Sequence, residues 1–345
     1  MTKNRLLKQS CNDLPNNYKF NGIDVVKFIC AVLVCILHIP PFNGRELEVD
    51  IFRYINFILQ QYLCRIAVPF YFVTSGFLLY RKTGFENLNV DLIKNYCFKI
   101  LRLLGTWTFI LFIGKSGQLW YLGALVLAVI LLSFLIKKGV SLKKIFILSV
   151  FFFMIGLLGT SYYGFIEPLK NYFIPKIIIS GYEALFQTTR NGIFFGFIFV
   201  FMGALFAQKR IVMNSSTAVG GLVISLAVMF FEIYFLRHYS QPKDFNMVAS
   251  LFPVVFFLFY ISTHIQLKDR PIYGSLRIIG LVIFFTHSFV NYFVDLALEI
   301  AKNKIGIDLT SFQFVIIICL TTILAVVIER LSKKEKFYWL KYLFS

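Results

Sequence analysis

Long apolar runs recur along the whole chain and are separated by short polar connections. Each run is close to the ~17 to 25 residues that a helix needs to cross a hydrocarbon core of roughly 30 Å. The pattern predicts ten transmembrane helices, at residues 22–40, 66–80, 96–114, 118–136, 143–160, 191–208, 217–236, 248–265, 275–294 and 309–329. An even number of helices places both termini on the same side. The predicted fold class is therefore all-α and integral to the membrane, with about ten transmembrane helices.

The composition agrees with this pattern and excludes a soluble globular enzyme. Of the 345 residues, 58% are hydrophobic and 18% are aromatic, and the mean hydropathy is +0.75. Residues 1–21 are polar, and the first apolar run has no small-residue cleavage site, so it should remain as the first helix. We predict a single membrane domain over residues 1–345, with tails at residues 1–21 and 330–345.

The distribution of charge predicts the orientation of this domain. Connections on the side of the N-terminus carry about twice as many Lys and Arg residues as those on the opposite side. Both termini are therefore expected in the cytoplasm. Orientation and anionic lipid headgroups account for the net charge of +18, so no nucleic-acid partner is needed. The six cysteines show no metal-ligand spacing, and no metal is expected.

The first predicted helix carries three ionisable residues. At 100° per residue, Asp24, Lys27 and His38 lie along one face, which should point into the bundle because charges in lipid are costly. The 14 residues between Asp24 and His38 span about 21 Å, so the two cannot act as one dyad. Asp24 and Lys27 could equally form an i, i+3 pair or extend to the cytoplasmic interface. His38 could be an interfacial histidine or a catalytic one.

Two further groups of polar residues lie at the ends of predicted helices. Lys94, Lys99 and Arg102 lie at the cytoplasmic entrance of the third helix, where they could bind the phosphates of a nucleotide-like ligand or serve as an ordinary positive-inside anchor. On the external side, Arg65 lies at the edge of the second helix, with Ser75 deeper. The other external-side candidates are Trp120, Tyr121, Arg190 and His287.

The external ends could form a site, because His38, Arg65, Arg190 and His287 share one predicted depth. Residues 41–65 and 161–190 form the two long external connections. The second is rich in tyrosine and suits a lid or an acceptor-binding surface, with an aromatic belt at headgroup level as the alternative.

Four segments resemble the membrane-bound acyltransferase-3 family. They are GIDVVKFICAVLVCILH (22–38), RIAVPFYFVTSGFLL (65–79), KILR (99–102) and QLWYL (118–122). An outer-half histidine in the ninth helix and the count of ten helices also fit the family. The first two segments together are fairly specific. The sequence has Lys27 and Lys99 where the family commonly has arginine.

The resemblance implies a function and roles for these residues. His38 would be the principal catalytic residue, Arg65 and Ser75 match the second-helix block, and Lys99 and Arg102 stand at the donor motif. The family moves acyl groups, commonly acetyl, from cytoplasmic acyl-coenzyme A to hydroxyls or amines of cell-envelope carbohydrates. The basic inner mouth, with Asp24, Lys27 and Lys94, would then receive the coenzyme A phosphates.

Within this scheme His38 would act as a general base, and Arg65 or Arg190 would stabilise the oxyanion. A multi-pass protein of a bacterial plasma membrane is implied.

A transporter is the main alternative. A similar membrane domain occurs fused to serine or alanine racemases of glycopeptide-resistant bacteria, where a role in serine uptake has been suggested, and TTRNGIFFGF (188–197) resembles that subgroup. No clear paired half-repeats or glycine-broken spans, which a transporter would be expected to show, are visible. A third possibility is a partner for polysaccharide export, with no acyl transfer.

Overall fold

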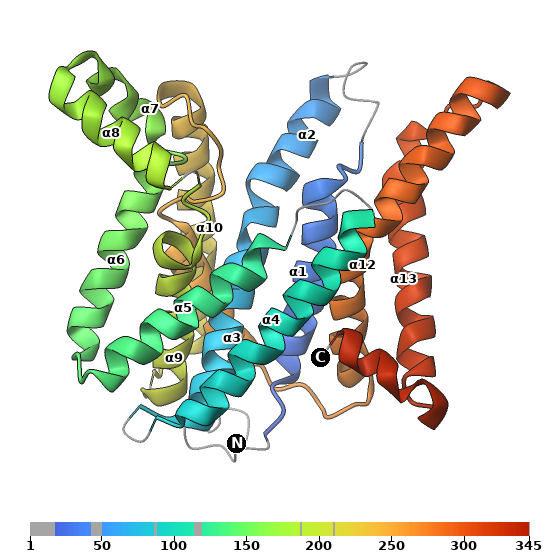
Figure 1. The fold of residues 1–345 in the computed structure, drawn as a ribbon, viewed down its shortest axis with the longest axis horizontal. Helices are drawn as coiled ribbons and strands as arrows, with labels where there is room; N and C mark the ends of the chain where they lie inside the picture. The colour runs from blue at the N-terminus through green and yellow to red at the C-terminus, as the bar shows by residue number, and fades with distance from the viewer. Residues whose placement is uncertain are drawn as a thin grey trace. The chain divides into compact units, whose positions relative to one another are not determined.

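The computed structural model describes residues 18–42, 50–85, 88–113, 119–186, 188–209 and 211–344, and in these ranges it contains helices and connecting segments but no β-strand (Figure 1). The α-helices are α1 (Asn21–His38), α2 (Asp50–Gln61), α3 (Ala67–Thr83), α4 (Val90–Ile113), α5 (Trp120–Lys137), α6 (Leu142–Leu158), α7 (Tyr163–Ile166), α8 (Phe173–Leu185), α9 (Phe197–Gln208), α10 (Ser215–Tyr239), α11 (Leu251–His264), α12 (Ile272–Ile300) and α13 (Gln313–Leu331).

Shorter helical turns complete the described chain. They are the 3-10 turns η3 (Leu63–Ile66), η4 (Glu167–Asn171), η7 (Thr310–Phe312) and η8 (Glu335–Leu343), and the π-helical turns η5 (Gly192–Gly196) and η6 (Ala301–Ile305). The side chain of Asn191 caps η5 by accepting hydrogen bonds from the backbone N–H groups of Ile193 and Phe194. The predicted helix at 191–208 therefore begins with a π-helical turn.

The predicted all-α class is confirmed, and each of the ten predicted ranges overlaps an α-helix of the described chain. Six helical segments of the described chain are long and apolar enough to cross a membrane, or seven if the bent pair of α6 with α7 and η4 is one span. The helices α9 and α11 are shorter. The count of ten spans and the cytoplasmic location of both termini remain predictions, and most of the predicted N-terminal tail lies outside the described residues.

The two long connections that were predicted to be external contain helices that the apolar pattern did not predict. The first contains α2, and the second contains α7, η4 and α8. The bend between α6 and the segment from Tyr163 to Asn171 is 78°. The predicted C-terminal tail is also helical, because η8 covers most of it.

The chain forms two compact units, and the division passes through α3 and α4. Unit 1 contains residues 69–98 and 120–265, and unit 2 contains residues 20–68, 99–119 and 266–345.

In unit 1, α3 and α9 approach so closely that only glycine fits at two positions. A Cβ added to Gly76 would lie 2.2 Å from the carbonyl oxygen of Val200, and one added to Gly203 would lie 2.0 Å from the carbonyl oxygen of Val73. Small residues allow such backbone contact between membrane helices.

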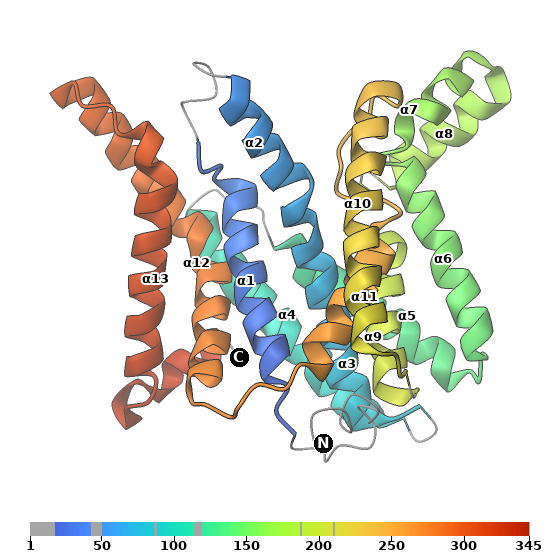
Figure 2. The same cartoon turned by 180° about the vertical axis from the view of Figure 1, so that it is seen from behind.

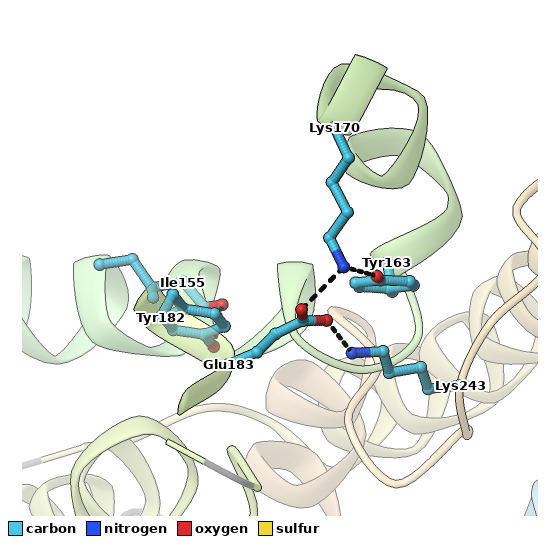
Figure 3. Close-up of polar contacts among 6 residues, drawn as sticks. All are labelled: Ile155, Tyr163, Lys170, Tyr182, Glu183 and Lys243. Atoms are coloured by element: carbon cyan, nitrogen blue, oxygen red, sulfur yellow. Dashed lines mark hydrogen bonds and ion pairs between the residues drawn. The ribbon is translucent and has the colours of Figure 1, made fainter. Parts of the chain in front are cut away.

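A charged cluster joins α7, η4 and α8 to the connection after α10 in unit 1 (Figure 3). Glu183 accepts hydrogen bonds from Lys170 (2.7 Å) and Lys243 (2.6 Å), and Lys170 also donates to the hydroxyl of Tyr163 (2.7 Å). The Lys243 ammonium lies 3.6 Å from the centre of the buried Tyr163 ring, close enough for a cation–π contact.

The hydrogen bonds from Lys170 and Lys243 lower the pKa of the Glu183 carboxyl to about 2. Because an unperturbed glutamate titrates at about pH 4.3, the cluster should stabilise the fold fully above that pH and lose its effect as the pH falls toward about 2.

We expect backbone amides of α8 to lose protection from hydrogen exchange as the pH falls from about 4.3 to about 2, after correction for intrinsic rates. Glu183→Gln should lose the same protection at neutral pH, whereas Glu167→Gln, an exposed control, should not. Equal protection in both variants would contradict this role.

In unit 2, α1, α12 and α13 pack side by side (Figures 1 and 2). Cys35, Ile39, Val294 and Ile317 form a buried apolar cluster between them. This packing fixes the end of α1, where His38 lies.

Candidate functional site

Two histidines meet at the end of α1 in unit 2. His38 is the last residue of α1 and is exposed, whereas His287 on α12 is only 2% exposed. Their rings are stacked, with centroids 5.6 Å apart and an interplanar angle of 25°. One imidazole is thus accessible, and a second, enclosed imidazole lies against its face.

The tautomer of His287 follows from its hydrogen bond. Its Nδ1 lies 3.1 Å from the carbonyl oxygen of Ile283, which can only accept, so Nδ1 carries the proton. In the neutral ring Nε2 is then an acceptor, and it is buried with no hydrogen-bond partner in the described part of the chain. His287 is therefore held in a fixed orientation beside His38, with its Nδ1 engaged by the backbone of α12.

The end of α2 and η3 surround the same end of α1. Gln60 donates to the carbonyl oxygen of Leu37 (3.0 Å), directly before His38, and the Arg65 guanidinium donates to the side chain of Gln61. η3, which carries Arg65, packs against α1. Arg65 thus lies in the same unit as both histidines. The two glutamines were not predicted, because α2 lies in what the apolar pattern reads as a connection.

The other end of α1 carries a group of three charges. Asp24 interacts electrostatically with Arg277 of α12 and with Lys27. The predicted i, i+3 neighbours therefore have a third member from α12. Arg277 was not predicted as part of the site, although its position within the predicted span 275–294 was a signal that could have identified it.

The three predicted phosphate ligands of α4 have different surroundings. Lys94 belongs to unit 1 and forms an exposed ion pair with Asp91 (3.9 Å). Lys99 and Arg102 belong to unit 2 and are both exposed, and the Arg102 guanidinium lies 5.7 Å from the centre of the Tyr342 ring in η8.

The C-terminal segment is held beside α4 in unit 2. The Trp107 indole N–H donates to the carbonyl oxygen of Leu343 (2.6 Å), and the buried Phe344 ring lies 5.3 Å from the Trp107 ring. Of the three predicted phosphate ligands, Arg102 therefore lies next to the C-terminal segment, which the sequence predicted only as a tail.

The remaining candidates belong to unit 1. The Ser75 hydroxyl lies 3.2 Å from the hydroxyl of the buried Tyr121, and the Arg190 guanidinium lies 5.8 Å from the centre of the Trp120 ring. The structure brings these four residues together as two pairs. In the described part of the chain, no three His, Cys, Asp or Glu side chains are grouped so that they could bind a metal ion.

Comparisons with known proteins place the histidine end of α1 within a recognised domain. Residues 20–117 match the acyltransferase domain of the acyltransferase-3 family, which confirms the resemblance. The match contains His38, Arg65, Ser75, Lys99 and Arg102. No solved structure matches the chain.

The curated relatives are named racemases, whereas the matching domain is named an acyltransferase domain. The chain is 30% identical to an amino-acid racemase of Enterococcus faecalis over 296 residues, which cover 78% of this chain and 39% of the relative. It is also 30% identical to a serine/alanine racemase of Enterococcus gallinarum over 269 residues, which cover 70% and 37%. A second amino-acid racemase of Enterococcus faecalis is 24% identical over 92% of this chain and 47% of the relative. The chain thus spans less than half the length of these relatives.

Proposed function

We propose that this chain, with its acyltransferase-3 match over residues 20–117, is a membrane-bound acyltransferase of a bacterial plasma membrane. It would move an acyl group, most simply acetyl, from cytoplasmic acyl-coenzyme A to a hydroxyl of a cell-envelope carbohydrate on the external side. The observation that carries this proposal is the pair of His38 and His287, in which an exposed imidazole at a helix end stacks on a buried one.

The pair suits general base catalysis. His38 would take the proton of the acceptor hydroxyl while the hydroxyl oxygen bonds to the thioester carbonyl carbon. The carbon–sulfur bond then breaks, and coenzyme A leaves as a thiolate that receives the proton from His38. The positive charge that His38 carries in between would lie over the ring face of neutral His287, at a distance typical of cation–π contacts.

Charged residues of unit 2 would assist the reaction. Arg65 lies in the same unit as the histidines and would stabilise the oxyanion. Lys99 and Arg102 would bind the phosphates of the acyl donor. Lys27 and Asp24, near the start of α1, are the other unit 2 residues that we assign to the donor site.

The role of His287 leads to a prediction about its substitutions. His287→Phe keeps an aromatic face beside His38 and should retain most of the transfer rate. His287→Ala removes the face and should lower kcat about three- to tenfold with little change in KM for the acceptor, because a cation–π contact contributes ~0.5 to 1 kcal/mol or more. Rates of coenzyme A release by both variants would test this. Equal loss of rate in the two variants would contradict the role of the ring face.

Binding of acyl-coenzyme A tests the donor half of the proposal. The full-length protein in detergent should bind labelled acetyl-coenzyme A, and Arg102→Gln should weaken binding about tenfold, as expected for a lost contact between a guanidinium and a phosphate. Lys304→Gln removes an exposed charge elsewhere and should bind as the wild type does. If the wild type binds no acyl-coenzyme A, the enzyme assignment is wrong.

The racemase names of the relatives favour a second candidate function. This chain aligns with the racemases over 70% or more of its length, so the shared region could handle an amino acid such as serine, as a carrier without acyl transfer. Uptake of labelled serine into proteoliposomes without acyl-coenzyme A would support this candidate. It would also leave the stacked histidines without a catalytic role.

A further inference from the structure

Unit 1 contains a cavity of about 620 Å³ at one end of its helices. The cavity lies where α3, α5 and α9 end and where α6 begins, and its size is typical of small-molecule sites. It is lined by Thr83, Gly84, Phe85, Ile136, Gly139, Val140, Ser141, Leu142, Gln208 and Lys209. None of these residues belongs to the candidate site described above.

The segments that form this cavity carry a one-sided charge. Residues 79–85, 134–146 and 205–209 contain no Asp or Glu, and their basic residues are Arg81, Lys82, Lys137, Lys138, Lys143, Lys144 and Lys209. Three helix C-termini contribute only about −0.5 charge each, so the region stays strongly positive. Lys143 and Lys144 lie in the first turn of α6, at the positive end of the helix dipole, which disfavours cations. Stabilisation of the helix is therefore not the reason why lysines stand at these two positions.

The lining also has two chemical characters. Ser141 and Lys209 offer polar groups, and the Ser141 hydroxyl makes no capping hydrogen bond to α6. The other two polar side chains of the lining already have partners, since Thr83 donates to the carbonyl oxygen of Leu79 and Gln208 donates to that of Tyr80. Four apolar side chains lie beside them: Phe85, Ile136, Val140 and Leu142. A ligand that fits both parts has an anionic head joined to an apolar body.

Exposed apolar side chains continue from the cavity along the same helices. Phe134 on α5 is 55% exposed, and Phe146 and Ile147 on α6 are 40% and 58% exposed. Since α5 is long and apolar enough to span a membrane, such side chains would face lipid. An amphiphile with its head in the cavity could therefore lay its acyl chains against these side chains.

We propose that this cavity binds the phosphate-bearing headgroup of an anionic phospholipid. Lys209 lines the cavity and meets the phosphate, and Lys143 and Lys144, which directly follow the lining residues Ser141 and Leu142, add positive charge at its rim, since basic pockets between membrane helices are suited to anionic headgroups. The bound lipid joins the ends of α3, α5, α6 and α9 and stabilises unit 1, because a ligand that binds only the folded state shifts the unfolding equilibrium. This inference does not depend on the acyltransferase reaction.

Native mass spectrometry of the delipidated full-length protein tests the proposal. Phosphatidylglycerol and phosphatidylcholine are added together, and the fraction of protein that retains each lipid is measured. The wild type should retain phosphatidylglycerol preferentially and gain thermal stability with it. The triple variant Lys143→Gln, Lys144→Gln, Lys209→Gln should raise its apparent Kd about tenfold or more, and the corresponding arginine variant should restore binding.

A matched control removes three exposed lysines elsewhere, Lys176→Gln, Lys268→Gln and Lys304→Gln, and should bind as the wild type does. Lys209→Gln alone provides a milder variant if the triple variant does not fold. Equal losses in the triple variant and the control would overturn the proposal, because net charge alone would then explain binding. Displacement of the lipid by coenzyme A or by inorganic phosphate would overturn the lipid identity and assign the cavity to a soluble phosphate compound.

Discussion

Replacing His38 with alanine is expected to lower the rate of acyl transfer by about 10²- to 10⁴-fold, the contribution that general acid–base catalysis typically makes. His38 is the exposed member of the stacked pair, so it alone can reach an acceptor hydroxyl. Binding of acyl-coenzyme A should be unchanged, because the donor contacts are assigned to other residues. The rate of coenzyme A release, followed with a thiol reagent in the presence of acceptor, measures this effect.

His238 offers a matched control for this experiment. It is also an exposed histidine in the last turn of a helix, α10, where its ring lies 4.3 Å from the ring of Tyr234. His238→Ala should keep the wild-type rate. If His38→Ala retains the wild-type rate, or if both variants lose activity equally, His38 is not the general base.

Replacing Gly203 with alanine is expected to destabilise unit 1 by about 1 to 3 kcal/mol or more, because the added methyl group would overlap the backbone of α3. The nearest atoms are the carbonyl oxygen of Val73 at 2.0 Å and the backbone nitrogen of Phe77 at 2.6 Å, so no flexible side chain can move aside. Gly76→Ala should have a similar effect through Val200. Thermal unfolding in detergent, followed by circular dichroism, measures the loss.

Gly220 in α10 provides the control for these substitutions. A Cβ at this position meets no atom within 4 Å, so Gly220→Ala should be neutral or slightly stabilising, as expected for glycine to alanine in an open helix. If Gly203→Ala and Gly220→Ala unfold at the same temperature, the close packing of α3 on α9 is wrong.

The helices were largely predictable from the sequence, because a run of apolar residues long enough to cross a bilayer has few alternatives to a helix. The range 22–40 became α1, and 217–236 became α10 with small shifts at the ends. The helices α2 and α8 were missed because each is short and lies in a connection, where hydropathy carries little information. The π-helical turn before α9 depends on capping by Asn191, which a pattern of apolar residues does not reveal.

The sequence predicted contacts in the candidate site only where residues at the same predicted depth in the membrane also lie on neighbouring helices. His38 and His287 were expected at one depth, and they meet. Depth alone does not say which helices are neighbours, so the interaction of Arg277 with Asp24 and the contact of Arg65 with Gln61 could not be inferred. For the same reason Trp120 and Arg190, expected at the depth of His38, were not predicted to belong to another compact unit.

Transfer across a sealed membrane tests the central claim most directly. Proteoliposomes of the full-length wild-type protein would hold acetyl-labelled acetyl-coenzyme A inside, with a cell-envelope glycan supplied outside. We expect label to appear on the external glycan while unlabelled coenzyme A accumulates inside, both in equal amounts. Label that stays inside as intact acetyl-coenzyme A, or glycan that is labelled only when both substrates share one side, would contradict it.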